Sequence, residues 1–238
     1  MRYSFGNNKL GKENVIVTSR PVGDTCPDTC EYLQSDECYA HKTEVRFTSA
    51  RRASFVNLVT ERNKIRAMLI TADAEGKDVR FHERGEFLKD GVLDTEYVEN
   101  IEWACQSIID SDDFNLPAIW FFTHVYDERL SALSRFGISC YASVHTDADY
   151  QAAKSAGFTL FAWNDNRAEY ADAKPRSRAK QEVWRDNLPR LVVINNEKFV
   201  TCPEMVHTYH KVTCTKTKNT RACRLCVDGK ANVLFPKH

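Results

Sequence analysis

Residues 118–146 read AIWFFTHVYDERLSALSRFGISCYASVHT, which is a strand pattern, a helix pattern and a second strand pattern in close succession. The outer segments are rich in β-branched and aromatic residues, and the segment from 127 to 136 carries apolar residues at helical spacing. A short helix between two short strands favours parallel pairing of those strands through a right-handed crossover. This stretch therefore predicts an α/β fold built on a parallel sheet.

The same alternation extends along most of the chain. Further strands are predicted at 14–18, 79–87, 158–165 and 190–195, and further helices at 49–75, 94–110, 147–156 and, after a basic loop, within 173–189. Six strands with intervening helices favour a partial (β/α)6 barrel over residues 1–195. Residues 196–238 lack this periodicity and are rich in Thr, Lys and Cys, so we expect a Cys-rich extension in which metal replaces a hydrophobic core.

The composition limits the classes of partner. Lys and Arg number 33, as do Asp and Glu, so no overall field attracts nucleic acid or a membrane surface, and a polyanion would need a local basic patch. No run of about 18 apolar residues occurs, and residues 1–10 lack a signal-peptide core. We therefore expect a cytoplasmic protein with no membrane partner, and in that compartment clustered cysteines indicate metal more often than disulfides.

Three of the nine cysteines lie in the loop CPDTCEYLQSDECYA (26–40), directly after the first predicted strand. These N-terminal cysteines are Cys26, Cys30 and Cys38. Three thiolates leave one position of a metal or cluster open for a ligand. The spacing is compatible with a [4Fe-4S] cluster, with zinc that borrows a fourth ligand such as His41, or with metal-free buried thiols.

A second group of four cysteines lies near the C-terminus: Cys202, Cys214, Cys223 and Cys226. Four thiolates can close a tetrahedral site, so these C-terminal cysteines predict a structural second [4Fe-4S] cluster or a zinc ion, and His207 or His210 could replace one thiolate. The remaining two, Cys105 and Cys140, share the periodicity of apolar neighbours and are predicted to be buried small hydrophobes.

Polar side chains follow the predicted strands, at the edge where α/β proteins bind ligands. The candidates for proton transfer at this edge are His82, Glu83, His124 and His145. Histidine titrates near neutral pH and can bind metal or move protons, although a single strand histidine is often an ordinary core residue. Because the first cysteine loop follows a strand, and Cys202 follows the last one, we expect both groups of cysteines at this edge.

A cysteine loop ending in Cys-Tyr-Ala and a second strand ending in Arg84-Gly85-Glu86 resemble the radical S-adenosylmethionine (SAM) superfamily. More narrowly, residues 14–226 are similar to the gene-product-88-like family of bacteriophage proteins, which share the His-Glu-x-Gly-Asp/Glu-Phe motif and a C-terminal cysteine group. The resemblance implies a barrel of radical-SAM type and a [4Fe-4S] cluster on the N-terminal cysteines whose open iron chelates SAM. It also implies that Gly85 and Glu86 meet the SAM amino group and that Ser143 meets the ribose.

This chain differs from the superfamily pattern at two points. Seven residues rather than two separate Cys30 from Cys38, and Arg84 occupies the place of a glycine. The sequence thus supports two hypotheses. The first is a radical-SAM-like iron–sulfur enzyme that acts on SAM and an unidentified substrate. The second is a non-enzymatic, metal-stabilised phage protein in the host cytoplasm that binds a host protein or nucleic acid.

Overall fold

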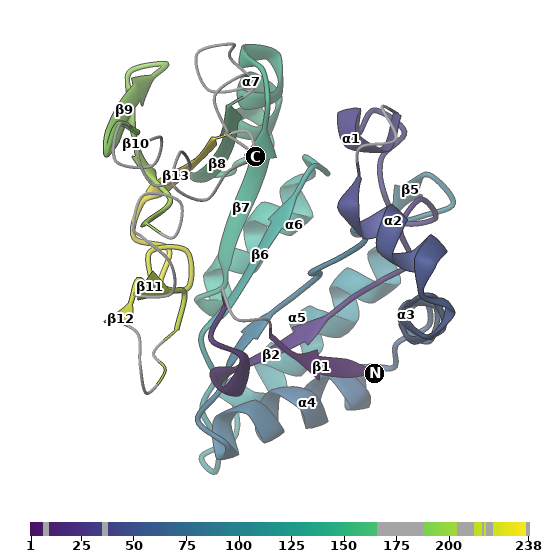
Figure 1. Ribbon diagram of the computed structural model, residues 1–238. Coiled ribbons are helices and arrows are strands. Elements are labelled where there is room, and N and C mark those ends of the chain that lie inside the picture. Colours follow the sequence, from purple (N-terminus) through teal and green to yellow (C-terminus); the bar gives the residue numbers. More distant parts are fainter. Residues whose placement is uncertain are drawn as a thin grey trace.

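The computed structural model describes residues 1–6, 10–34, 38–165, 188–203, 212–215, 217 and 221–236. Its centre is a nine-stranded sheet in the order β1-β2-β3-β6-β7-β8-β13-β10-β9 (Figure 1). The strands are β1 Tyr3–Phe5, β2 Val15–Thr18, β3 Asp78–Arg80, β6 Ile119–Thr123, β7 Ser139–Val144, β8 Leu160–Asp165, β9 Leu191–Ile194, β10 Glu197–Thr201 and β13 Asn232–Pro236. All neighbours from β2 to β10 in this order pair in parallel. The predicted α/β class is confirmed, and the described sheet is open, with β1 and β9 at its edges.

Helices connect the strands largely where the sequence predicts them. They are α1 Glu31–Gln34, α2 Tyr39–Arg46, α3 Thr48–Phe55, α4 Arg62–Ala74, α5 Thr95–Ile109, α6 Glu128–Ala132 and α7 Asp147–Ser155, with 3-10 turns at Lys12–Asn14 and Leu133–Phe136. Two small sheets pair β4 Leu88–Lys89 with β5 Val92–Leu93 and β11 Val212–Thr213 with β12 Arg221–Ala222. Among the described helices, none has the length and apolar content needed to cross a bilayer. The helix expected within 173–189 lies outside the described residues.

The single helix predicted at 49–75 is wrong, because the chain breaks between α3 and α4. Asn57 lies in this break and is almost fully buried. Its side-chain amide donates to the carbonyl oxygens of Arg2 and Ser19, both at 2.8 Å, and its side-chain oxygen accepts from the backbone N–H of Arg2 at the same distance. A buried amide that bonds distant backbone groups in this way competes with the helix and fixes the break.

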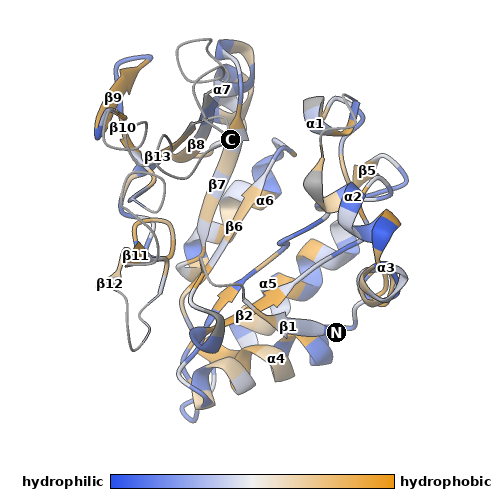
Figure 2. Ribbon diagram, viewed as in Figure 1, coloured by the Kyte–Doolittle hydropathy of each residue, from blue (hydrophilic) through white to orange (hydrophobic). Residues whose placement is uncertain are grey.

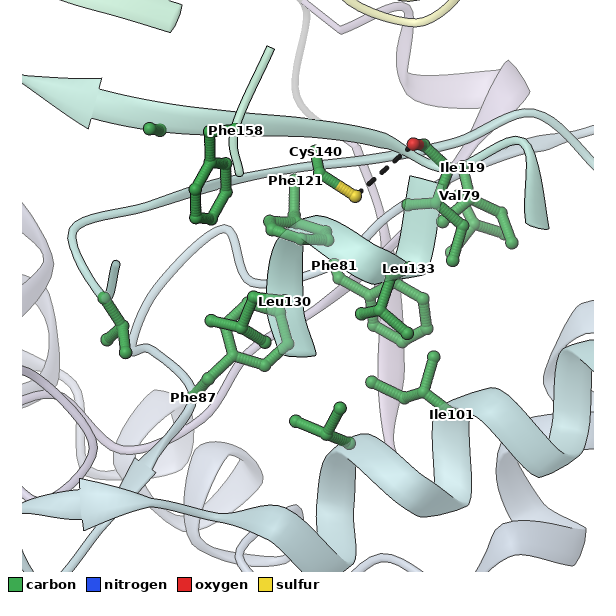
Figure 3. Packing of buried hydrophobic residues seen from close by; sticks show 14 of the residues in the cluster. Val79, Phe81, Phe87, Ile101, Ile119, Phe121, Leu130, Leu133, Cys140 and Phe158 are labelled. Atoms are coloured by element: carbon green, nitrogen blue, oxygen red, sulfur yellow. Dashed lines mark hydrogen bonds between the residues drawn. The ribbon is translucent and has the colours of Figure 1, made fainter. Parts of the chain in front are cut away.

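One face of the sheet is covered by helices α4 and α5 and packs into the main hydrophobic core (Figures 1 and 2). Figure 3 shows the rings of Phe81, Phe87 and Phe121 packed against Leu130 and Leu133. Cys105 and Cys140 lie in the same cluster, and the prediction that both are buried is confirmed.

The C-terminal part of the chain joins the sheet in an order that differs from the prediction. We expected residues 190–195 to form the sixth parallel strand, but β9 lies at the edge and pairs antiparallel with β10. Asn195 and Asn196 form the two-residue turn between them, with φ of +52° and +63°, and such a turn produces a hairpin. The place beside β8 is taken by β13. Residues 196–238 therefore contribute strands to the main sheet, although we expected no regular pattern there.

Candidate functional site

The N-terminal cysteines lie in a tightly turned loop between β2 and α2. The Cys30 N–H donates to the Pro27 carbonyl at 2.9 Å, and the Cys38 Sγ accepts from the His41 N–H at 3.4 Å, which caps α2. Burial first, then the negative charge of Glu86 and the two other thiolates, raises the pKa of Cys26 to about 12. Burial also raises the pKa of Cys30. These two thiols are therefore protonated at neutral pH in the absence of metal, and metal binding would release their protons.

Glu86 lies beside this loop, in the turn after β3, and its residue is only 6% exposed. Its Oε2 accepts a hydrogen bond from the Thr123 Oγ1 at 2.7 Å, and its Oε1 accepts from the His124 backbone N–H at 3.1 Å. The His124 Nδ1 also lies 3.1 Å from Oε1. Because Thr123 ends β6, these contacts hold the carboxylate at the carboxyl ends of two neighbouring parallel strands.

A pair of histidines extends this arrangement to β7. The Nε2 atoms of His124 and His145 are 3.1 Å apart, and their rings are stacked at an interplanar angle of 16°. Tyr32, which lies between Cys30 and Cys38 in sequence, contacts the His145 ring edge-on at 5.2 Å. Burial, followed by the charge of His124, lowers the pKa of His145 to about 4. The cysteine loop thus packs against the end of β7 and lies close to Glu86. We refer to Glu86, His124 and His145 as the Glu86 cluster.

Ser143 and Tyr126 lie near the same end of β7. Ser143 is buried, and its carbonyl oxygen accepts a hydrogen bond from the Tyr126 hydroxyl at 2.6 Å. Strand alternation places the Ser143 side chain on the same face as that of Tyr141, opposite the helix-covered core that contains Ala142 and Val144. Ser143 and His145 therefore belong to one face and one end of β7.

Gly85 is required by close backbone packing. Its φ is +74°, and a Cβ atom there would lie 2.3 Å from the Arg20 carbonyl oxygen and 2.8 Å from the Thr25 Oγ1. The Thr25 hydroxyl accepts from the Glu86 N–H at 2.8 Å. The turn at residues 84–86 is therefore locked against the loop after β2, which fixes the position of Glu86.

Arg20 is a member of the site that sequence reasoning missed. Its side chain is fully buried, forms an ion pair with Asp94, and lies with its guanidinium 4.5 Å from the centre of the Tyr97 ring. Its Nη1 donates to the Glu86 carbonyl oxygen at 3.1 Å. The only signal in the sequence is an arginine directly after a buried strand, which is too common to indicate a buried ion pair.

One sequence candidate, His82, lies in the core, and the contact described for another, Glu83, is made by its backbone. His82 is buried among aromatic rings, with its Nε2 at 3.0 Å from the Tyr97 hydroxyl and its ring 4.3 Å from that of Phe87. Burial, followed by the charge of Arg20, lowers its pKa well below the ordinary value. Glu83 is partly buried, and its backbone N–H donates to the Thr18 carbonyl. The structure groups Glu86 with His124 and His145 and places His82 in the core.

The C-terminal cysteines all line one small pocket, with a volume of about 20 Å³, on the sheet face opposite α4 and α5. Burial first, then the charges of the other three thiolates, raises the pKa of Cys226, whereas Arg80 lowers it. Arg224 pairs with Asp78 at the start of β3, and the Ser139 hydroxyl at the start of β7 donates to the Val227 carbonyl. The expectation that both cysteine groups lie at the same edge is wrong for Cys226, because these contacts anchor residues 224–227 at the opposite ends of β3 and β7. Cys202, in contrast, follows the carboxyl end of β10.

Neither group is arranged as a finished metal site. Among the residues that the structure describes, no three His, Cys, Asp or Glu side chains stand close enough together to hold a metal ion. The charges of neighbouring thiolates nevertheless contribute to the raised pKa of Cys26 and of Cys226. Rearrangement of the side chains would be needed to complete either site. His207 and His210 lie outside the described residues.

Comparison with known proteins identifies no relative. No family model, no curated protein and no solved structure matches this chain. The chemistry of the site is therefore argued from its own residues.

Proposed function

We propose that this chain is an iron–sulfur protein of radical-SAM type, in which the N-terminal cysteines hold a [4Fe-4S] cluster that leaves one iron open to SAM. The observation that carries the proposal is the position of Glu86. Its backbone N–H donates to the Thr25 hydroxyl, next to Cys26, and Tyr32 of the same loop contacts His145, so the loop after β2 packs against the Glu86 cluster. An open sheet in which β2, β3, β6, β7, β8 and β13 are parallel and adjacent also suits a partial (β/α)6 barrel of that type.

The residues present fit such a cofactor in their chemistry. Three thiols match three irons of a cubane cluster, and the fourth iron would be the open position. A carboxylate accepts charge-assisted hydrogen bonds from an ammonium group, and Thr123 and His124 hold Glu86 in a fixed position for this role. We place the SAM amino group at Glu86 and the ribose near Ser143. When bound, the cluster would supply one-electron reduction of SAM, and the protein would position and shield it.

For proton transfer we propose His124 and His145 rather than His82 or Glu83, because His124 contacts the Glu86 carboxylate and His145 contacts His124. The Glu86 carboxylate accepts the Nδ1–H of His124, which leaves Nε2 facing His145. At most one proton fits between the two Nε2 atoms at 3.1 Å, so the pair would hold or pass a single proton.

For the C-terminal cysteines we propose a structural site that holds a second [4Fe-4S] cluster or a zinc ion. The supporting observation is that all four cysteines line one pocket, together with Arg224 and Val233. The positive charge of Arg80 near Cys226 would offset part of the negative charge of a four-thiolate site. Metal binding there would tie residues 202–227 to the sheet.

The proposal is tested by calorimetric titration of cluster-replete protein with SAM. Glu86→Gln removes the carboxylate charge, and we expect about 10-fold to 100-fold weaker binding, which is the size of a charge-assisted hydrogen bond. Glu99→Gln is the matched control, because Glu99 is exposed on α5. SAM binding that is absent, or that is equally strong in Glu86→Gln, would favour the non-enzymatic binding protein.

A further inference from the structure

Residues 45–59, which include the end of α2, all of α3 and the break after it, carry the largest concentration of exposed apolar residues on the described chain. Exposed large hydrophobic side chains occur at eleven described positions, and five of these lie within this segment. They are Val45, Phe47, Phe55, Val56 and Val59. Helices α2 and α3 stand at the edge of the molecule, on the side opposite β9 and β10 (Figure 1). A patch of this kind marks an interaction surface more often than a solvent-exposed helix pair.

The same segment is basic, although the whole chain is neutral. The exposed cations are Lys42, Arg46, Arg51 and Arg52. The one acidic residue between 39 and 60 is Glu44. It is buried and accepts the Val22 N–H at 3.2 Å, so its charge does not belong to the exposed surface of this segment. Within the described part of the chain, none of the four cations forms an ion pair. We name these four cations and five apolar residues the α2–α3 surface.

Two aromatic rings of this surface each lie against an arginine. The Arg46 guanidinium lies 5.4 Å from the centre of the Phe47 ring, and that of Arg51 lies 5.5 Å from the centre of the Phe55 ring. Proteins that bind single strands use exposed aromatic rings to stack on bases and nearby cations to contact the phosphates. A membrane-surface helix instead presents a continuous apolar face, whereas only Val45 and Phe55 of the five exposed apolar residues lie within α2 and α3.

From this charge and ring pattern we propose that the α2–α3 surface binds single-stranded nucleic acid. Lys42, Arg46, Arg51 and Arg52 contact phosphates, and Phe47 and Phe55 stack on bases. Helix α2 begins at its N-cap, Cys38, so a strand bound here lies beside the N-terminal cysteines. If the proposed function holds, nucleic acid is also the substrate class. Binding itself needs no cluster and is tested separately.

The test is fluorescence anisotropy of a labelled 15-nucleotide poly(dT) strand with the full chain, at several salt concentrations. Replacing both Arg51 and Arg52 with alanine should reduce the slope of log K against log salt by about 1.4, because each single-strand phosphate contact contributes about 0.7. The double variant R51K/R52K should keep the slope. Replacing both Phe47 and Phe55 with alanine should weaken binding at least about 5-fold with little change in slope.

Controls and alternative partners decide the outcome. Arg135→Ala removes an exposed arginine that pairs with Glu102 and should bind like the parent chain. Circular dichroism and thermal melting check that each variant is folded, and a chain without the N-terminal cysteines should still bind the strand. Absence of binding, or equal affinity in the Phe47/Phe55 variant, overturns the proposal. Preferential binding to vesicles with 30% phosphatidylserine overturns it in favour of a membrane. Displacement of the labelled strand by poly-glutamate as readily as by unlabelled poly(dT) overturns it in favour of an acidic protein.

Discussion

Replacing Gly85 with alanine should destabilise the chain far more than the same change at Gly91. Both glycines have left-handed backbones, with φ of +74° and +77°. At Gly91 nothing lies within 4 Å of the added Cβ, so the variant bears only the cost of that backbone conformation, about 1–2 kcal/mol. At Gly85 the Cβ would lie 2.3 Å from a backbone oxygen, and the loop must therefore move.

The additional cost at Gly85 follows from the hydrogen bonds at this contact. The Arg20 N–H donates to the Arg84 carbonyl at 2.9 Å, the Glu86 N–H to the Thr25 hydroxyl at 2.8 Å, and the Arg20 Nη1 to the Glu86 carbonyl at 3.1 Å. Losing two or three of them, at about 1 kcal/mol each, brings the expected total to about 3–5 kcal/mol. Urea denaturation of Gly85→Ala and Gly91→Ala measures the difference. Equal free energies of unfolding in the two variants would refute the argument that the turn is locked by packing.

Three further predictions concern the cysteines and the histidine pair. Replacing all three N-terminal cysteines with alanine should remove about half of the bound iron, given a second cluster of equal size, and unchanged iron would contradict their role as ligands. Cys223→Ala should lower the melting temperature or cause aggregation, whereas a soluble variant with full metal content would show that the C-terminal cysteines bind none. The pKa of His145 falls from 6.5 in the unfolded chain to about 4, so below pH 6.5 the unfolded chain binds a proton that the folded chain does not. The free energy of unfolding should therefore fall by at most about 3 kcal/mol as the pH is lowered from 6.5 to 4. Urea denaturation measures this, and the same pH dependence in a His145→Asn variant would contradict the assignment of the effect to His145.

The sequence predicted the parts of the fold that depend on local patterns. The parallel strands β2, β3, β6, β7 and β8 follow from short apolar runs separated by amphipathic helices. The strand ends also indicated His124 and His145 at one edge, because the carboxyl ends of parallel strands meet there, whereas Glu86 was indicated by the family resemblance. Burial of Cys105 and Cys140 followed from their periodicity.

Long-range contacts decided the features that the sequence did not reveal. The break between α3 and α4 depends on hydrogen bonds from Asn57 to Arg2 and Ser19, which no local pattern indicates. The hairpin turn at 195–196 could have been suspected from two consecutive asparagines, since this residue tolerates positive φ. The insertion of β13 beside β8 joins residues about 70 positions apart, and a pattern search limited to neighbouring residues does not detect such a pairing.

The central claim is that the N-terminal cysteines hold an iron–sulfur cluster beside Glu86. Its most direct test is the visible absorption spectrum and iron content of the anaerobically purified chain, compared with a variant in which Cys26, Cys30 and Cys38 are replaced with alanine. We expect broad iron–sulfur absorption in the parent chain and about four fewer irons per chain in the variant. A colourless protein that contains zinc or no metal, while the chain remains folded, would contradict the claim.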